Sequence, residues 1–213
     1  MTLLELEQAK ELNSVEYRNR GGVNTLRSLA DFVSDLGFSS EEELRDYFKQ
    51  TRVLDAGSGY NGLAMALCLG GVDAQVLSIN PTFDDPKYEI RQRDLISDRF
   101  KKSGFFQGRC FKDIEQARVL ANQNTFVASA HNLPFESDYF DRVIDNFAVT
   151  TYFIERFSFS YRKSLEELIR VTKPEGKIRI SPKTVFEDDW KMEVLELIGL
   201  PMEEHPNGIE LTK

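Results

Sequence analysis

The sequence has few of the residues that build metal centres and disulfide frameworks. Its 213 residues include two cysteines, Cys68 and Cys110, and two histidines, His131 and His205. None of the four stands at a spacing typical of metal ligands, so we expect no metal site. The low number of cysteines indicates a reducing, cytoplasmic compartment. The phosphate-binding motif GxxxxGK[ST] and the nucleophile motif GxSxG are also missing. The chain therefore lacks the motifs of zinc enzymes, P-loop enzymes and α/β-hydrolases.

Long apolar segments are absent too. No apolar run reaches about 18 residues, the length that would indicate a membrane span. The first residues, MTLLELEQAK, carry acids where a signal peptide has basic residues followed by an apolar stretch. The formal net charge of −8 argues against a general binder of nucleic acids or anionic membranes. With 41% hydrophobic residues, the chain has enough apolar side chains for one domain with a substantial core, spanning residues 1–213.

The hydrophobic pattern changes along the chain. Residues 1–50 read as a helical lead-in, because Leu26, Leu29, Ala30 and Val33 recur at helical spacing. Residues 51–213 alternate short apolar strands with helices, and the strand segments read VLDA, AQVLSI, TFVASA, DRVIDN and KIRISP. Such alternation predicts an α/β fold, a doubly wound and mostly parallel sheet with helices on both faces. A helix through Trp190 and a closing antiparallel hairpin around Pro206, Asn207 and Gly208 complete the prediction.

The stretch VLDAGSGYNG, residues 53–62, follows the first predicted strand. Its glycines match the pattern GxGxxG, which on its own fits a plain strand-to-helix turn as well as a nucleotide-binding loop. Ligands of doubly wound sheets bind at the carboxyl ends of the strands near the point where the strand order reverses. The stretch is therefore the first candidate for a binding site.

Further motifs follow this stretch in a recognisable order. They are Leu133-Pro134-Phe135, Asp138, the segment FDRVI at 140–144, and Glu167 followed by RVTKPEG at 170–176. Together with DAGSG at 55–59 they resemble the motifs of the class I S-adenosylmethionine-dependent methyltransferases, in particular the LPFxDxxFDxV group, called methyltransferase type 11-like. The resemblance covers residues 51 to about 181. It implies S-adenosyl-L-methionine as cofactor and a Rossmann-like sheet of seven strands in the order 3-2-1-4-5-7-6, with the last strand antiparallel.

The resemblance also implies roles for individual residues. Asp55 would receive the ammonium group of the cofactor, while Gly57, Ser58 and Gly59 would let the backbone pass close to its methionine part. Asp145 and Asn146 would end the fourth strand on the side of the transferable methyl group.

Two positions depart from the family pattern. Asn80 stands where the family has an acid that binds both ribose hydroxyls, and Ser129, followed by Ala130, stands where it has an acid near the adenine. Neutral acceptors form weaker hydrogen bonds than carboxylates. We therefore expect weakened binding of S-adenosylmethionine, which Asn80→Asp should tighten. The alternative for Asn80 is a turn residue before Pro81.

More than forty residues separate Asn80 from the third predicted strand, so we predict a helical insertion at about 83–122. From Lys87 to Arg118 it carries nine basic and five acidic residues, with interleaved aromatics. This segment could be a lid or a platform for an anionic acceptor, or simply two helices with a solvated basic face. A second aromatic group, between Tyr152 and Tyr161, could line an apolar acceptor pocket or pack a helix onto the sheet.

The leading hypothesis is a methyltransferase that acts on a small-molecule acceptor, possibly anionic or aromatic. No catalytic residue is assigned, because methyl transfer depends mainly on alignment of the acceptor. The second hypothesis is a methyltransferase-like binding or regulatory protein without catalysis. A nicotinamide oxidoreductase is a third and weaker hypothesis, because Asp55 would repel a pyrophosphate. The sequence indicates neither the acceptor nor the oligomeric state.

Overall fold

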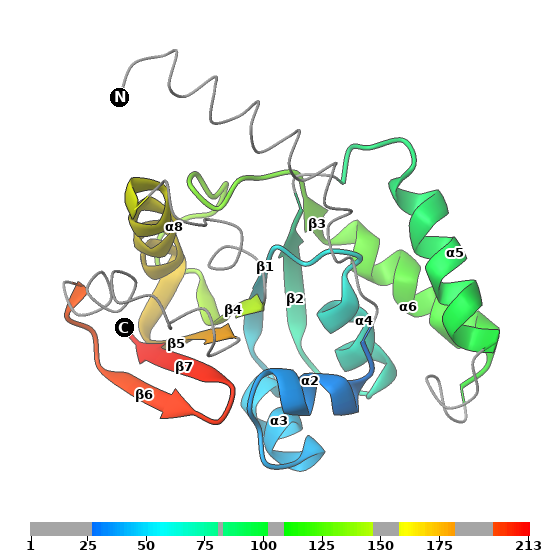
Figure 1. Ribbon diagram of the computed structural model, residues 1–213, viewed down its shortest axis with the longest axis horizontal. Coiled ribbons are helices and arrows are strands. Elements are labelled where there is room, and N and C mark those ends of the chain that lie inside the picture. The colour runs from blue at the N-terminus through cyan, green and yellow to red at the C-terminus, as the bar shows by residue number, and fades with distance from the viewer. Residues whose placement is uncertain (1–26, 81–82, 102–108, 147–157, 182–197) are drawn as a thin grey trace.

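The computed structural model describes residues 27–80, 83–101, 109–146, 158–181 and 198–213. Seven strands form one sheet in the order β3-β2-β1-β4-β5-β7-β6 (Figure 1). The strands are β1 (Arg52–Ala56), β2 (Gln75–Ile79), β3 (Thr125–Phe126), β4 (Phe140–Asn146), β5 (Thr172–Ser181), β6 (Met202–His205) and β7 (Gly208–Thr212). The pairs among β1 to β5 are parallel, and β7 is antiparallel to both of its neighbours. The predicted strand order and the antiparallel seventh strand are confirmed.

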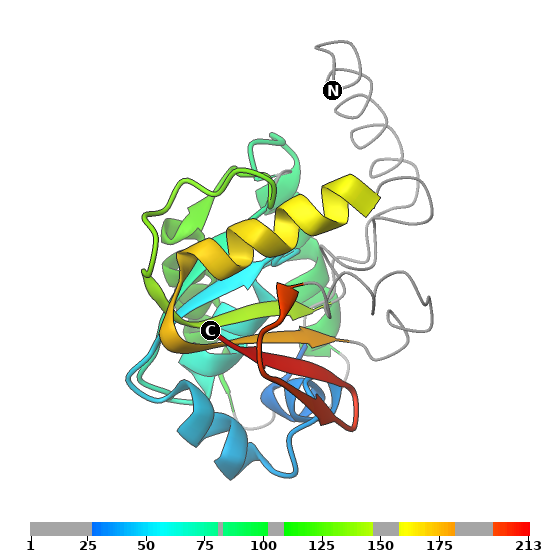
Figure 2. The same ribbon diagram turned by 90° about the vertical axis from the view of Figure 1, so that its left-hand side faces the viewer.

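Strand alternation sends side chains to two separate cores. On one face, Leu54 and Ala56 pack with residues of the helix α8 (Ser158–Val171). On the other, Val53 and Val76 pack against α2 (Leu29–Asp35), α3 (Glu41–Phe48) and α4 (Gly62–Leu69). Figure 2 shows α8 on the side of the sheet opposite α2 and α3. Helices therefore cover both faces, as the alternating pattern predicts.

The insertion is helical in its described part. It contains α5 (Tyr88–Lys101) and α6 (Phe111–Gln123), and buried Ile114 and Ala121 of α6 pack into the core that α4 shares. Figure 1 shows α6 between α4 and α5, beside the β3 edge of the sheet.

Two strand boundaries differ from the sequence prediction. β3 stops at Phe126, because its partner β2 ends at Ile79 and the last pairing bond runs from the Asn80 N–H to the Phe126 carbonyl. β5 begins at Thr172, five residues before the predicted segment KIRISP, and the Thr172 hydroxyl donates to the Leu168 carbonyl at 2.6 Å. The helix predicted through Trp190 and the aromatic residues Tyr152, Phe153 and Phe157 lie outside the described residues.

The hairpin β6–β7 holds the lead-in helices against the sheet. The Asn207 side chain in the hairpin turn donates to the carbonyls of Ser34 and Asp35 at the end of α2. Gly208 lies so close to β5 that a Cβ atom there would stand 2.1 Å from the Ile180 carbonyl oxygen. Only glycine therefore allows this close packing of the hairpin.

A buried charged pair lies between the hairpin and α3. Arg179 of β5 is 2% exposed, and its Nη1 lies 3.7 Å from Oε2 of Glu210, which is 3% exposed. The Arg179 guanidinium stacks over the Phe38 ring at 3.9 Å, and Lys177 Nζ lies 2.5 Å from the other Glu210 oxygen. Removing one partner of such a pair leaves the other charge buried with weaker compensation.

We predict that Arg179→Ala lowers the free energy of unfolding by about 3 kcal/mol, because Glu210 stays buried and the stacking on Phe38 is lost. The matched control is Arg162→Ala, which removes an exposed ion pair with Glu166 and should change stability by less than about 0.5 kcal/mol. Urea denaturation of both variants measures the difference. Equal effects would show that the buried pair contributes no more than a surface pair.

Candidate functional site

The glycine loop between β1 and α4 lies where two adjacent strands end. Gly57 and Gly59 have φ angles of 79° and 56°, a left-handed conformation that favours glycine. The N–H groups of Gly57 and Ser58 both donate to the Ile79 carbonyl at 3.1 Å, which ties the loop to the end of β2. The predicted glycines are thus needed for the turn itself, and the loop remains half-buried at the carboxyl edge of the sheet.

Two side chains from outside the loop donate to one of its carbonyls. The Tyr88 hydroxyl at the start of α5 donates to the Gly59 oxygen at 2.8 Å, and the Asn80 side-chain amide donates to the same oxygen. Asn80 is 0% exposed and Tyr88 3%. A carbonyl oxygen only accepts, so the NH₂ group of Asn80 is the one that faces the loop.

A second set of buried amides fixes the following residues. Asn61, in the left-handed conformation before α4, accepts from the Ser58 hydroxyl at 2.9 Å and donates to Asn122 and Thr125, each at 2.8 Å. Gln92 of α5 donates to the Tyr60 carbonyl at 2.9 Å and exchanges hydrogen bonds with Asn122. The loop is therefore held from β2, α5 and α6 at once.

Asp55 lies at the carboxyl end of β1 and is 5% exposed. Burial, and to a smaller extent the nearby charge of Asp145, raise the pKa of its carboxyl to about 7, while the charge of Arg27 opposes both effects. Asp145, at the end of the neighbouring strand β4, is 0% exposed. Two buried acids in electrostatic contact favour a cation between or beside them.

Asn146 follows Asp145 and ends β4. The Ser181 hydroxyl, at the end of β5, donates to its side-chain oxygen at 2.9 Å. The two residues are also paired in the sheet. Asp145 and Asn146 therefore lie at the same edge of the sheet as Asp55, as their places in the sequence predict.

Ser129 and Ala130 lie in the segment after β3, where Ser129 is exposed and its Oγ lies 2.9 Å from His131 Nδ1. Ala130 packs partly against the core. Glu167 and Arg170 of α8 hold the LPF segment that follows. The Leu133 N–H donates to Glu167, and Arg170 donates to the carbonyls of Leu133 and Phe135. The hydrogen bond from Arg170 lowers the pKa of Glu167, so this support stays ionised near neutral pH.

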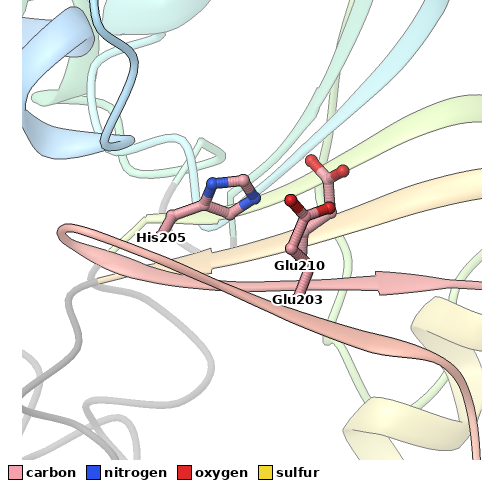
Figure 3. A group of neighbouring side chains, drawn as sticks. All are labelled: Glu203, His205 and Glu210. Atoms are coloured by element: carbon pink, nitrogen blue, oxygen red, sulfur yellow. The ribbon is translucent and has the colours of Figure 1, made fainter.

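Among the described residues, one group has the composition of a metal site. Glu203, His205 and Glu210 extend from the hairpin toward one another, with ligand atoms within 4.8 Å (Figure 3). Both Glu210 oxygens already face cations, Lys177 and Arg179. A divalent ion would be repelled by these two charges, so the group fits the ion-pair network of the hairpin better than it fits a metal.

The structure thus brings Asp55, the glycine loop and Asn80 together, with Asp145 and Asn146 on the next strand. Sequence reasoning missed Tyr88, Gln92, Asn61 and Asn122. Asn61 could have been noticed, because Asn before Gly is typical of left-handed backbone. Tyr88 and Gln92 are four residues apart on one helix, but nothing in the sequence identifies the loop as their partner.

Comparison with known proteins supports the motif-based resemblance. Residues 109–180 match the family model described as a methyltransferase domain. None of the curated proteins matches the chain at a significant level. By sequence and fold together, the resemblance to the class I S-adenosylmethionine-dependent methyltransferases is confirmed.

Solved structures resemble the chain at low sequence identity. The PH0226 protein of Pyrococcus horikoshii OT3 has 16% identity and a TM-score of 0.51, with 92% of this chain and 96% of that chain covered. A putative S-adenosyl-L-methionine-dependent methyltransferase of Methanococcus maripaludis has 18% identity and a TM-score of 0.49, covering 81% and 82%. The first of these likenesses supports the fold alone.

No helix among the described residues is both long and apolar enough to cross a membrane.

We predict that Asp55→Asn stabilises the protein at pH 8 but not at pH 4. The pKa of Asp55 is raised from its ordinary value of 3.8 to about 7, so the folded state holds this proton more tightly than the unfolded state. Wild-type stability should therefore fall as the pH rises from about 4 to 7, by up to about 1.4 kcal/mol per pKa unit. Urea denaturation across this range measures the effect, with Asp46→Asn, exposed on α3, as control. A difference in unfolding free energy between Asp55→Asn and wild type that stays constant across this pH range would contradict the prediction.

Proposed function

We propose that this domain, which matches the methyltransferase family model and has the methyltransferase fold, binds S-adenosylmethionine and transfers its methyl group to a small molecule. The observation that carries the proposal is the buried acid Asp55, with Asp145 beside it, next to a left-handed glycine loop. The cofactor combines an ammonium and a sulfonium group with a carboxylate, so one end of it is a cation of the kind that two buried acids favour.

The chain's residues fit the methionine end of the cofactor well. Asp55 would hold the ammonium group, which would keep this carboxyl ionised. Gly57, Ser58 and Gly59 present backbone without bulky side chains at the same edge. Asn146, whose amide is oriented by Ser181, would lie near the methyl group and help to align the acceptor. When bound, the cofactor supplies an electrophilic methyl group, and the protein's task is to exclude water and hold the acceptor in line.

The nucleoside end fits less well. The Asn80 amide faces the Gly59 carbonyl, and the Ser129 hydroxyl lies against His131, so neither position offers a carboxylate. Neutral partners would give this end weaker hydrogen bonds. This observation favours the second candidate function, a methyltransferase-like binding or regulatory protein with low cofactor affinity.

The acceptor is proposed to be small and not held by the basic residues of the insertion. Arg91 pairs with Asp85, Arg93 lies 3.9 Å from Glu89, and Arg118 is buried against Glu115. These cations are partly neutralised by acids of the same segment. The pairing favours a solvated helix face over a dedicated site for an anionic acceptor.

We predict that S-adenosylmethionine binding releases protons near neutral pH. Asp55, with a pKa of about 7, is about half protonated in the free protein at pH 7, and an ammonium partner should drive that proton off. Titration calorimetry in buffers of different ionisation enthalpy should therefore report about half a proton released per site at pH 7. Asp55→Asn should bind at least about tenfold more weakly and release none.

The controls separate the candidate functions. Asp46→Asn should bind as wild type does. Binding of NAD in place of S-adenosylmethionine would favour the oxidoreductase hypothesis. Absence of binding at millimolar S-adenosylmethionine would exclude the enzyme. If binding is found, a screen with methyl-labelled cofactor against small-molecule acceptors tests for transfer, and binding without any transfer would favour the regulatory candidate.

A further inference from the structure

We infer that Asn80, with Tyr88 and Gln92 of α5, positions the glycine loop, and that Asn80 is not a weakened substitute for a ribose-binding acid. The inference rests on the proposed function, because the glycine loop is the proposed cofactor site. According to this inference, helix α5 of the insertion holds the loop of that site in place. These three residues are therefore positioning residues.

The Gly59 carbonyl is the centre of the arrangement. It accepts from the Asn80 amide and from the Tyr88 hydroxyl, which arrive from the end of β2 and from the start of α5. Both donor side chains are buried. Because both donors reach this carbonyl from buried positions, water does not readily replace a donor that is lost, and the loss costs free energy.

The next carbonyl along the loop is held in the same way. Gln92, one helical turn after Tyr88 and 0% exposed, donates to the Tyr60 oxygen at 2.9 Å. The Tyr60 and Tyr88 rings also pack against each other, with centroids 5.2 Å apart. Two consecutive peptide carbonyls and one ring of the loop are thus in contact with a single face of α5. Movement of α5 would change the conformation of the loop.

This geometry reverses the expected effect of restoring an acid at position 80. A carboxylate has no proton to donate at neutral pH, so Asn80→Asp would replace the donating NH₂ group with a negatively charged oxygen facing the Gly59 carbonyl. The loop would lose one donor and gain a repulsion. Asn80→Asp should therefore loosen the loop and weaken cofactor binding, whereas the family pattern alone predicts tighter binding.

The first test needs no cofactor. Hydrogen exchange of the cofactor-free protein, read in peptides covering Gly57 to Gly62, should be about tenfold faster in Asn80→Asp and several-fold faster in Tyr88→Phe than in wild type. Gln75→Glu adds the same charge at the exposed amino end of β2, and Tyr139→Phe removes a hydroxyl far along the chain from the loop. Both controls should exchange these amides at the wild-type rate. Wild-type exchange in both Asn80→Asp and Tyr88→Phe would overturn the inference.

The second test measures S-adenosylmethionine affinity by titration calorimetry. The dissociation constant should rise about tenfold in Asn80→Asp and several-fold in Tyr88→Phe, with the Gln75→Glu value unchanged. Tighter binding by Asn80→Asp would overturn the inference and restore a ribose-binding role. If wild type binds no cofactor, the proposed function fails, and the exchange measurement still decides the inference. Should Asn80→Asp not fold, Tyr88→Phe, which removes one oxygen atom, carries both measurements.

Discussion

The central position of β1 is the constraint on which the site depends. β1 pairs in parallel with β2 on one side and with β4 on the other, so the sheet extends from β1 in both directions. The strand order reverses at β1, so the connections that follow neighbouring strands run in opposite directions. This leaves the carboxyl end of β1 open. Asp55, the glycine loop and Asp145 all occur at that point. The place of the candidate site is thus a consequence of strand order, and the side chains define its chemistry.

The chemistry of the site opposes the stability of the fold. Burial of Asp55 beside the charge of Asp145 raises the pKa of Asp55, with burial as the larger cause, so the ionised form of Asp55 is unfavourable until a cation neutralises it. The buried acid of the hairpin avoids this cost. Glu210 is as deeply buried as Asp55, yet it faces both Lys177 and Arg179. Among the described residues, the charge of Arg27 lowers the pKa of Asp55 less than burial and Asp145 raise it. A buried acid with such incomplete compensation at the end of a central strand is typical of a binding site.

The fold could be predicted largely because its signals are local or belong to a recurring pattern. The alternating strands and helices, Gly70 directly after α4, and the Pro206–Gly208 turn each determine one element within a few residues. The length of β3 depends on where β2 ends, and the start of β5 on the pairing of Thr172 with Phe140, so neither follows from its own segment. Asp55 and Asp145 were identified through the family resemblance, at the ends of predicted strands, whereas Tyr88 and Gln92 meet the loop only through tertiary packing.

Position 80 illustrates why a motif alone does not determine a role. The family pattern compares Asn80 with an acid at the same strand end and treats the amide as the weaker acceptor. In the folded chain the relevant atom is the NH₂ group, because the Gly59 carbonyl next to it can only accept. Tyr88 donates to the same oxygen from an insertion that the shared pattern does not include. The change from acid to amide is therefore best understood together with α5, as one arrangement that holds the loop by neutral hydrogen bonds.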